Sequence, residues 1–457
     1  LDRGGEEPVL HSVTLDKEKC KGCTTCIKQC PTEAIRVRRG KAHILTERCI
    51  DCGQCIRVCP HHAKKAVCDP LSDLDKFQYK VALPAPSLYG QFHNLDDINI
   101  VLTALLSLGF DDVYEVSRGA EMISDLTRRE LAQKGFPKPI ISSACPAATR
   151  LICMRFPKLV KNIALHIAPV EIAAIHAREE AVQKSGLKPE QIGIFFITPC
   201  PAKVTAAHNP LLLQDPVIDG AISIAEIYKR LLPAMKQVKE PLQLAHSGII
   251  GIGWARSGGE ASAILNDKQL AVDGIQNIID ILEAVENGFL PDVEFLELNA
   301  CNQGCVGGCL TIENPYAAKA RLKRLMKFLP ISRNKLLDED VERVKASPDS
   351  LLKYAPDRAL DEDRAAAMAK FMKIDSLTEE LPGLDCGSCG APSCHALAED
   401  IVLGMASEED CIFHMRDRMR YMAGNGDADE YLPPPFRAYT GDGAEDELSE
   451  EANDGNN

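Results

Sequence analysis

The sequence predicts three folded parts: a small α+β part near the N-terminus, a larger α/β part with largely parallel sheets, and a small helical part near the C-terminus. A four-cysteine motif occurs twice within residues 20–60, and from residue 80 short apolar strands alternate with amphipathic helices. A further cysteine motif follows a charged helical stretch. The predicted parts are 1–78 (α+β), 79–330 (α/β), 331–375 (charged helical linker), 376–424 (helical, cysteine-containing) and 425–457 (acidic disordered tail).

The N-terminal part carries Cys20-x2-Cys23-x2-Cys26-x3-Cys30-Pro31 and then Cys49-x2-Cys52-x2-Cys55-x3-Cys59-Pro60. The doubled run resembles the bacterial two-cluster ferredoxins, in which the fourth cysteine of each motif ligates the other cluster. It therefore predicts a ferredoxin-like domain, with Ile35, Val37, His43 and Leu45 in strands between the motifs. One [4Fe–4S] cluster would take Cys20, Cys23, Cys26 and Cys59, and the second Cys49, Cys52, Cys55 and Cys30. Zinc is the alternative, but zinc motifs usually place two ligands on each knuckle.

The larger part reads as alternating strands and helices. The predicted strands are Val81–Leu83, Asp112–Val116, Pro139–Ile141, Ile192–Phe196 and Val293–Leu296. Apolar residues at every third or fourth position predict helices such as Leu95–Leu108 and Ile222–Leu232. Open parallel sheets bind their ligands at the carboxyl ends of the strands, so we expect the chemistry there.

Four more cysteines follow three of these strands. Cys145 comes after Ile140–Ile141 and before Pro146, Cys200 follows a strand in the same way, and Cys301 and Cys305 follow Val293–Leu296. Thiolates from three strand–helix corners can converge on one further cube. The glycines around the last pair permit a close approach of backbone to a bulky cofactor.

These segments resemble the signatures of [FeFe]-hydrogenases. The family patterns Thr-Ser-Cys-Cys-Pro, Met-Pro-Cys-x-x-Lys and Met-x-Cys-x-x-x-Cys-x-Gly-Gly match residues 142–146, 198–203 and 299–308, and similarity extends over roughly residues 15–325. The resemblance implies an α/β H-cluster domain, in which a [4Fe–4S] cube is bridged to a two-iron centre with CO, cyanide and dithiolate amine ligands. It implies that Cys305 bridges, that Cys145, Cys200 and Cys301 complete the cube, and that Lys203 hydrogen-bonds a cyanide.

The sequence departs from the family at three positions. Ala144 stands where fast members have a proton-relaying cysteine, and Thr198 and Asn299 replace methionines near the two-iron centre. These changes resemble divergent, slow or sensory branches of the family, so lower turnover or another proton route is expected. Glu121, Asp125 and Glu130 lie on a predicted helix before the first signature, and we expect exposed helix charges there.

The last motif, Cys386-x2-Cys389-x4-Cys394-x16-Cys411, resembles the small [4Fe–4S] domain of redox-complex and corrinoid-linked subunits, with a zinc knuckle as the alternative. It predicts a small helical [4Fe–4S] domain with these four cysteines as ligands, and so three [4Fe–4S] clusters besides the H-cluster. The remaining cysteines, Cys68, Cys153 and Cys309, are expected to be small buried apolar residues.

Composition limits the partners. The 457 residues carry a net charge of −14, which argues against nucleic acid and anionic membranes. No apolar run approaches the roughly 20 residues of a membrane span, and no signal-peptide pattern opens the chain, so we expect a cytoplasmic protein with reduced cysteines. Expected partners are H₂, protons, and a ferredoxin or redox-complex subunit. There is no GxGxxG fingerprint and no P-loop, so flavin or NAD chemistry would belong to a partner subunit.

Three functions follow from the resemblance. The first is an oxidoreductase that interconverts H₂ with protons and electrons, fed through the cubes. The second is a slow hydrogen sensor that signals through a partner. The third is a noncatalytic electron-transfer or assembly protein that binds only cubes, although such relatives lack this combination of N- and C-terminal cluster domains.

Overall fold

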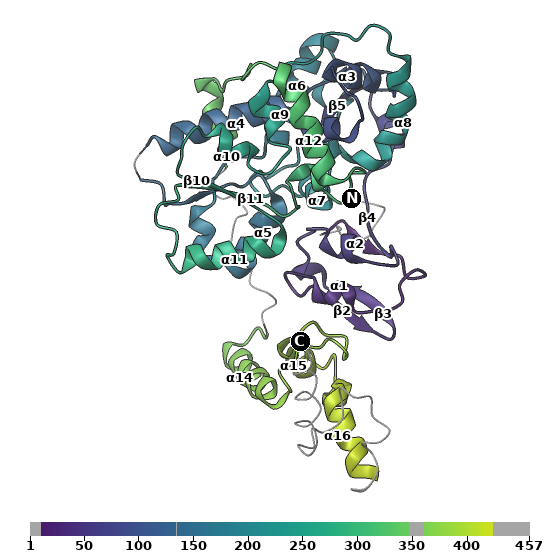
Figure 1. The fold of residues 1–457 in the computed structure, drawn as a ribbon, viewed down its shortest axis with the longest axis vertical. Coiled ribbons are helices and arrows are strands. Elements are labelled where there is room, and N and C mark those ends of the chain that lie inside the picture. The colour runs from purple at the N-terminus through teal and green to yellow at the C-terminus, as the bar shows by residue number, and fades with distance from the viewer. Residues whose placement is uncertain (1–10, 134, 347–359, 424–457) are drawn as a thin grey trace, which may run out of the picture. The chain divides into compact units, whose positions relative to one another are not determined.

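The computed structural model describes residues 11–133, 135–346 and 360–423 (Figure 1). The chain divides into two compact units, Leu1–Ala359 and Leu360–Asn457. The predicted acidic tail, 425–457, lies outside the described residues. Within the described ranges, no helix has the length and apolar character needed to cross a bilayer.

The N-terminal part of the first unit contains two short antiparallel pairs of strands. Strand β1 (Val13–Leu15) pairs antiparallel with β4 (Lys64–Ala66), and β2 (Ile35–Arg38) pairs antiparallel with β3 (Lys41–Ile44). Each cysteine motif ends in a short helix, α1 (Thr25–Lys28) or α2 (Gln54–Val58), so the sequence repeat is also a structural repeat. Ile27, Ile35 and Ala63 form a small core together with the cysteines.

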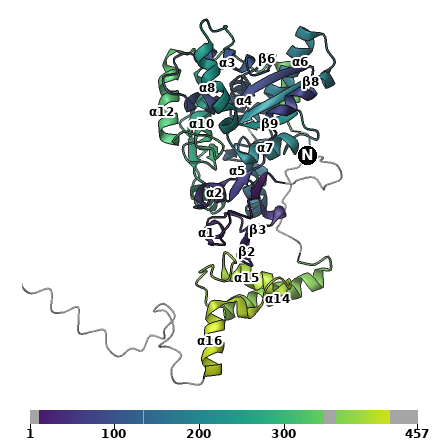
Figure 2. The ribbon, with the colours of Figure 1, turned by 90° about the vertical axis from the view of Figure 1, so that its right-hand side faces the viewer.

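A four-stranded parallel sheet forms the centre of the larger part. Its order is β6 (Asp112–Val113), β5 (Tyr79–Pro84), β8 (Ile192–Thr198) and β9 (Gly220–Ser223). Successive side chains of a strand point to opposite faces. Phe195 and Ile197 therefore join the core with α3 (Ile98–Leu106) and α8 (Ile224–Gln237), whereas Phe196 joins the core with α6 (Pro169–Ser185). Figure 2 shows the ribbons of these helices and of strands β8 and β9.

A second parallel sheet has the order β10 (Gln269–Asp273), β11 (Phe295–Asn299) and β7 (Ile140–Ile141). Leu296 and Leu298 pack with α5 (Pro146–Arg155) and α11 (Ile275–Glu286) on one face. Phe295 packs with residues of α10 (Gly259–Ala263) on the other. Both sheets are therefore covered on both faces, as parallel sheets require.

The expected alternation and the parallel pairing are confirmed, with differences in detail. The strand predicted at Asp112–Val116 is only two residues long, because α4 (Val116–Leu131) begins at its expected end. Strands β9 and β10 were not predicted. The remaining helices of this unit are α7 (Pro201–His208), α9 (Ile249–Gly253), α12 (Pro315–Leu325) and α13 (Val341–Val344). Short 3₁₀ turns η1 to η8 connect these elements, including η3 (Pro86–Gln91) and η6 (Cys305–Gly307).

Residues 331–346, expected as the start of a charged linker, pack on the larger part. Leu336 and Val344 are buried against α4 and α6 residues, and Lys345 forms a β-bridge with His166. Most of the expected linker that follows lies either in the undescribed residues 347–359 or in the second unit.

The second unit consists of α14 (Arg364–Glu380), α15 (Cys394–Val402), the turn η9 (Glu408–Asp410) and α16 (Ile412–Ala423). Ile374 and Leu377 of α14 and Leu397 of α15 are the centre of its core. No strand occurs among its described residues 360–423.

Candidate active site and iron–sulfur centres

Four cysteines of the N-terminal part surround one cavity. Cys20, Cys23, Cys26 and Cys59 line it together with Lys64, which is 3% exposed. The Lys64 Nζ atom has no hydrogen-bond partner among the described residues, although it is buried. A buried ammonium requires acceptors. The sulfides and thiolates of an iron–sulfur cube would supply them, so this cavity fits such a group.

The other four ferredoxin-type cysteines are also neighbours. Burial raises the pKa of the Cys52 thiol well above its ordinary range, and the nearby Cys30 and Cys55 raise it further. Cys49 experiences the charges of the same two cysteines and of Asp51. Four clustered thiolates are thus unfavourable without a cation between them. Metal binding removes that penalty, because the ligands release their protons to solvent and the metal cation compensates the negative charge of the thiolates.

The strand–helix corners of the larger part position the remaining signature cysteines. Cys145 is the N-cap residue of α5 and Cys200 that of α7, and each helix has proline at its first position. Cys301 follows β11, and Cys305 begins η6 after Gly304, whose φ of 86° places it in the left-handed region. An added Cβ at Gly304 would collide with the backbone of Arg256 and Ser257, so this turn requires glycine.

These four cysteines come together, and three of them, Cys145, Cys200 and Cys305, lie around Lys203. Its Nζ atom donates to the Sγ atom of Cys305 over 3.4 Å. Burial disfavours the ammonium, but the charges of Cys305, Cys200 and Cys145 outweigh burial and raise the Lys203 pKa. Burial raises the pKa of Cys200 and Cys305, and in both cases Lys203 opposes the rise while the neighbouring thiolates add to it. The set fits a cationic metal cluster with one organic cation beside it.

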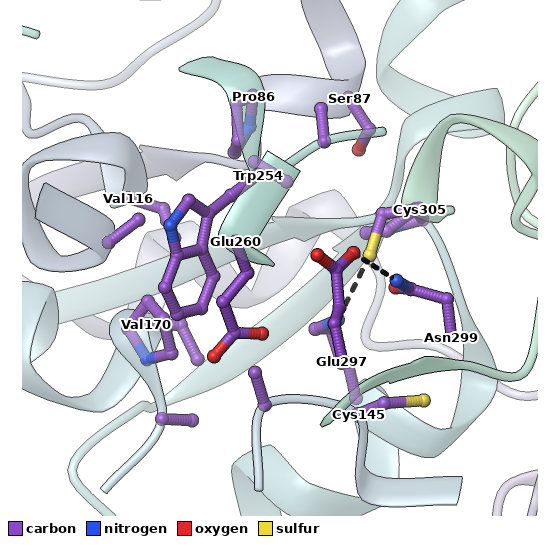
Figure 3. A pocket seen from close by; sticks show the side chains of 18 of the residues that line it. Pro86, Ser87, Val116, Cys145, Val170, Trp254, Glu260, Glu297, Asn299 and Cys305 are labelled. Carbon is purple, nitrogen blue, oxygen red and sulfur yellow. Dashed lines mark hydrogen bonds between the residues drawn. The ribbon is translucent and has the colours of Figure 1, made fainter. Parts of the chain in front are cut away.

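A cavity of about 60 Å³ opens next to Cys145, Cys305 and Lys203. Its walls come from elements far apart in the sequence, including Pro86, Val170 and Trp254. The Trp254 indole nitrogen donates to Ser124 Oγ over 2.9 Å, which holds the ring against the cavity. Figure 3 shows Trp254 on the left and Cys305 on the right, with the carboxylates of Glu260 and Glu297 between them.

Glu260 and Glu297 are buried carboxylates in the cavity wall. Glu297 accepts from the backbone of Gly258 and Ala261 and from Asn299 Nδ2, at 3.0, 2.7 and 2.6 Å. Glu260 has one such donor, the Ser142 hydroxyl at 2.7 Å. Burial and the adjacent Glu297 raise the Glu260 pKa to about 8. Because Glu297 is the better-bonded carboxylate, Glu260 is the group of this pair that holds a proton near neutral pH.

Of the three residues that depart from the signature patterns, Ala144 and Asn299 line the cavity and Thr198 does not. Ala144 lines the cavity, and its backbone N–H donates to Ser142 Oγ, the hydroxyl that reaches Glu260. Asn299 also lines the cavity, where it donates to Glu297. Thr198 is fully buried and accepts a long hydrogen bond, 3.5 Å, from the backbone N–H of Cys200.

The expectation of exposed charges on the helix before the first signature is wrong for two residues. Glu121 is 1% exposed and accepts from the backbone of Gly248, Arg333 and Asn334. Glu130 is buried beside His166, whose Nε2 lies 2.6 Å from its carboxylate. Helix α4 is enclosed by α6, α9 and residues 331–346, so its polar side is not free. Asp125 is only partly exposed and pairs with Arg128 and Arg129.

Sequence reasoning missed a link between the second ferredoxin motif and the active-site loop. The Arg57 guanidinium of α2 donates to Cys301 Sγ over 2.9 Å and to the Gly307 carbonyl over 3.0 Å. A Cβ on Gly53 of the same motif would collide with Cys309 Sγ. The alternation of apolar residues, which guided the strand predictions, carries no information on such contacts between distant loops.

Of the three cysteines outside the motifs, two lie in apolar surroundings. Cys153 is buried in the core beneath the second sheet, and Cys68 is half-buried beside the core of the first. Cys309 is half-buried, and the charges of Arg57, Cys301 and Cys52 act on its thiol. Burial raises the pKa of Cys309 to about 12, so it remains a thiol at neutral pH.

In the second unit, Cys389, Cys394 and Cys411 pack against one core, and Cys386 lies exposed on the same loop. Gly387 and Gly390 have φ of 78° and 82°, which folds the loop tightly between the cysteines. The Cys394 backbone N–H donates to Asp385 over 2.6 Å and fixes the start of α15. The loop and the start of α15 therefore place Cys389 and Cys394 beside the same core as Cys411.

Three family models match the chain. The iron-only hydrogenase large subunit, C-terminal domain, matches residues 78–267 and 259–309, just over half of the 457 residues. A 4Fe-4S dicluster domain matches residues 12–60, and a putative Fe-S cluster domain matches residues 381–413. The dicluster match covers both N-terminal cysteine sets, and each of the other two matches covers one set.

The chain is also similar to known proteins. The chain is 25% identical over 368 residues to iron hydrogenase 1 of Clostridium pasteurianum, and the match covers 65% of this chain and 64% of that protein. The chain thus spans less than two thirds of the length of this relative. A structure from work on oxygen inactivation of [FeFe]-hydrogenase aligns at 14% identity with a TM-score of 0.48, over 61% of this chain and 97% of the other.

An [FeFe]-hydrogenase variant from Chlamydomonas reinhardtii aligns at 15% identity with a TM-score of 0.46, over 57% of this chain and 90% of the other. The family assignment itself rests on the family model, which covers both sheets up to the loop that holds Cys301 and Cys305. An iron–sulfur protein with this domain is what the signature cysteines and the fold together indicate. The chain belongs to the iron-only hydrogenase large-subunit family.

Proposed function

We propose that the chain is an [FeFe]-hydrogenase that interconverts H₂ with two protons and two electrons. The observation that carries the proposal is the convergence of Cys145, Cys200 and Cys305 on the Lys203 ammonium, beside a largely apolar cavity. A structural zinc site would not need a cavity next to its ligands, nor a cation in contact with one of them.

In this proposal Cys145, Cys200, Cys301 and Cys305 hold the cube of an H-cluster, and Cys305 also bridges to its two-iron centre. When bound, the two-iron centre supplies the reversible heterolytic cleavage of H₂. Lys203 holds a positive charge in contact with Cys305 and orients a negatively charged ligand in the cavity. The apolar wall around Val170 and Pro86 excludes water.

Glu260 handles protons in the proposed reaction. Its carboxylate lines the cavity, and its raised pKa lets it bind and release a proton near neutral pH. Ala144 has no group that can relay a proton, but its neighbour Ser142 donates to Glu260. Ser142 and Glu260 would therefore carry the proton past Ala144, with Glu297 as the next carboxylate.

Electrons would pass through a ferredoxin-like N-terminal domain with two [4Fe–4S] clusters. One is held by Cys20, Cys23, Cys26 and Cys59, and the other by Cys49, Cys52, Cys55 and Cys30. Lys64 supports the first assignment, since it lines that cavity and its buried Nζ has no hydrogen-bond partner among the described residues. The small helical C-terminal domain would hold a third [4Fe–4S] cluster, with Cys386, Cys389, Cys394 and Cys411 as ligands. Through this cluster the domain would exchange electrons with a ferredoxin, a redox-complex subunit or a flavin- or NAD-binding partner.

A slow hydrogen sensor is the second candidate, and Ala144 favours it. With the Ala144 methyl group in the cavity wall, proton delivery would rest on Glu260, which would limit turnover. A sensor would keep the same cofactor and ligands. Turnover rate therefore separates the two functions, whereas the identity of the bound cluster does not.

Infrared spectroscopy of the anaerobically matured full chain tests the proposal. Bands in the CO and cyanide stretching region that shift under H₂ are the expected result, and Cys305→Ser should abolish them. A spectrum without such bands, in protein whose cubes are fully occupied, would contradict the proposal and favour a cube-only electron-transfer protein.

A further inference from the structure

The Arg57 guanidinium lies between two of the cysteine sets. Arg57 is carried by α2, two residues after Cys55, and its Nη1 atom donates weakly to the Cys52 carbonyl over 3.4 Å. Its Nη2 atom donates to Cys301 Sγ over 2.9 Å. One planar group therefore contacts the backbone of a second-motif cysteine and the sulfur of an active-site cysteine.

The surroundings hold Arg57 in this place. The Gly307 carbonyl accepts from the same Nη2 atom over 3.0 Å, so the guanidinium has two fixed acceptors on the active-site loop. Gly53 packs so closely against Cys309 of that loop that an added Cβ would collide with the Cys309 Sγ atom. Although Arg57 is exposed as a residue, the charges of Cys301, Cys309 and Cys52 all act on its guanidinium.

A second arginine at the same junction makes a useful comparison. Arg155 of α5 reaches in the opposite direction, from the larger part to the Pro31 carbonyl of the first motif, over 3.0 Å. It is exposed, like Arg57. Among the described residues, Arg155 donates to this backbone carbonyl and to no cysteine sulfur. Arg155 therefore ties the two parts together without a direct bond to a cluster ligand.

We propose that Arg57 is a positioning residue for electron entry, which raises the reduction potential of the cube held by Cys301 and connects it to the second ferredoxin cube. The inference rests on the proposed function, since both cubes belong to it. In the step concerned, one electron leaves the cube held by Cys52 and enters the cube held by Cys301. The first is oxidised by one electron and the second reduced by one, and no bond forms or breaks.

The direction of the effect follows from charge. Reduction makes a cube and its thiolates more negative, and a hydrogen bond from a cation to a ligand sulfur stabilises that state more than the oxidised one. The planar guanidinium can satisfy Cys301 and Gly307 at once, which an ammonium cannot do with the same geometry. Because Arg57 is exposed, water screens part of its charge, so a moderate effect is expected.

The test is a redox titration of the full chain, reconstituted with iron and sulfide but without the two-iron centre and followed by electron paramagnetic resonance. The wave that disappears in Cys200→Ser marks the active-site cube. In Arg57→Gln the midpoint potential of this wave should become more negative by about 40 mV. At about 59 mV per tenfold for one electron, this shift is about a fivefold change in the equilibrium constant for electron transfer. Arg57→Lys should restore part of the shift, because the charge remains.

Arg155→Gln is the matched control and should leave the wave in place. If the wave does not move in Arg57→Gln, or moves equally in Arg155→Gln, the inference is overturned and the proposed function is untouched. If Cys200→Ser removes no wave, the active-site cube itself is absent and both fail. Thermal unfolding checks that the variants fold, and Arg57→Met, which keeps the length of the stem, replaces the glutamine variant if that one does not.

Discussion

Lys203 Nζ donates to Cys305 Sγ over 3.4 Å at the wall of the active-site cavity. The pair joins the first turn of α7 to the turn η6, two elements that are 102 residues apart in the sequence. A buried ammonium in contact with a thiolate is a strong charge-assisted contact. It also orients the proposed bridging cysteine toward the cavity.

Lys203→Met should weaken retention of the two-iron centre. The substitution keeps the length of the side chain but removes the charge that faces Cys305, and hydrogen bonds to charged groups contribute about 1.5–3 kcal/mol. We expect the CO and cyanide band intensity per bound iron to fall roughly tenfold or more. Lys158→Met, at an exposed lysine of the same unit, is the control. Equal band intensity in the two variants would contradict the role of Lys203.

Glu260→Gln should lower H₂ turnover by about 100-fold or more, the usual range for a lost general acid–base group. The amide keeps the size of the side chain and can still accept from Ser142, but it cannot transfer a proton. Glu171→Gln is the control, since Glu171 is a second buried carboxylate with a raised pKa that does not line the cavity. Turnover is measured by dye reduction under H₂ at equal cluster content. Unchanged turnover in Glu260→Gln would mean that protons enter elsewhere.

The parts of the site that the sequence predicts are those fixed by local pattern. Cys145 and Cys200 each follow an apolar strand and precede a proline, so their place at a helix N-terminus follows from the order of residues alone. Strand β10 was missed because all five of its residues are only partly buried, which leaves no alternation to detect. Strand β9 is four residues long and begins with Gly220, a poor strand former.

Contacts between distant segments were beyond prediction. Glu260 and Glu297 are 37 residues apart and belong to different elements, and only the packing of α10 against β11 makes them neighbours. Arg57 reads as an ordinary charge in a ferredoxin motif until η6 is placed beside it. Glu121 looks solvated on a helical wheel, but Asn334 lies more than 200 residues further along the chain and covers it.

Glu171 predicts a pH dependence of stability. Burial raises its pKa from 4.5 to about 7, although the Ala168 backbone N–H at 2.6 Å opposes the rise. The folded state thus binds this proton more tightly than the unfolded state. The contribution of Glu171 to the unfolding free energy is therefore largest below about pH 4.5, falls between about pH 4.5 and 7, and is constant above. The rise corresponds to about 3 kcal/mol.

Glu171→Gln should remove this component. Its melting temperature at pH 8 should exceed that of the unsubstituted protein, and the difference should shrink as the pH falls toward 5. Thermal unfolding at several pH values measures it, with Glu226→Gln, at an exposed glutamate of α8, as the control. A constant difference across the range would show that Glu171 does not titrate between the two states.

Gly53→Ala should disrupt the junction between the second ferredoxin motif and the active-site loop. Gly53 has a φ of 71°, and an added Cβ would collide with Cys309 Sγ. Gly40 is a matched control, because its φ is also 71° but nothing lies within 4 Å of an added Cβ. Both alanine variants carry the backbone strain of the left-handed region, about 1–3 kcal/mol, so the difference between them isolates the collision.

We expect Gly53→Ala to lower the unfolding free energy further than Gly40→Ala, and to slow electron delivery from a reduced dye to the active-site cube. The segment that carries Gly53 must move away from Cys309. Because α2 begins at the residue after Gly53, this movement also displaces Arg57 from Cys301. Denaturant unfolding and stopped-flow reduction measure the two effects. Identical behaviour of the two variants would mean that the loop yields without cost. Slow reduction in Gly53→Ala at unchanged stability would instead locate the whole effect in the electron path.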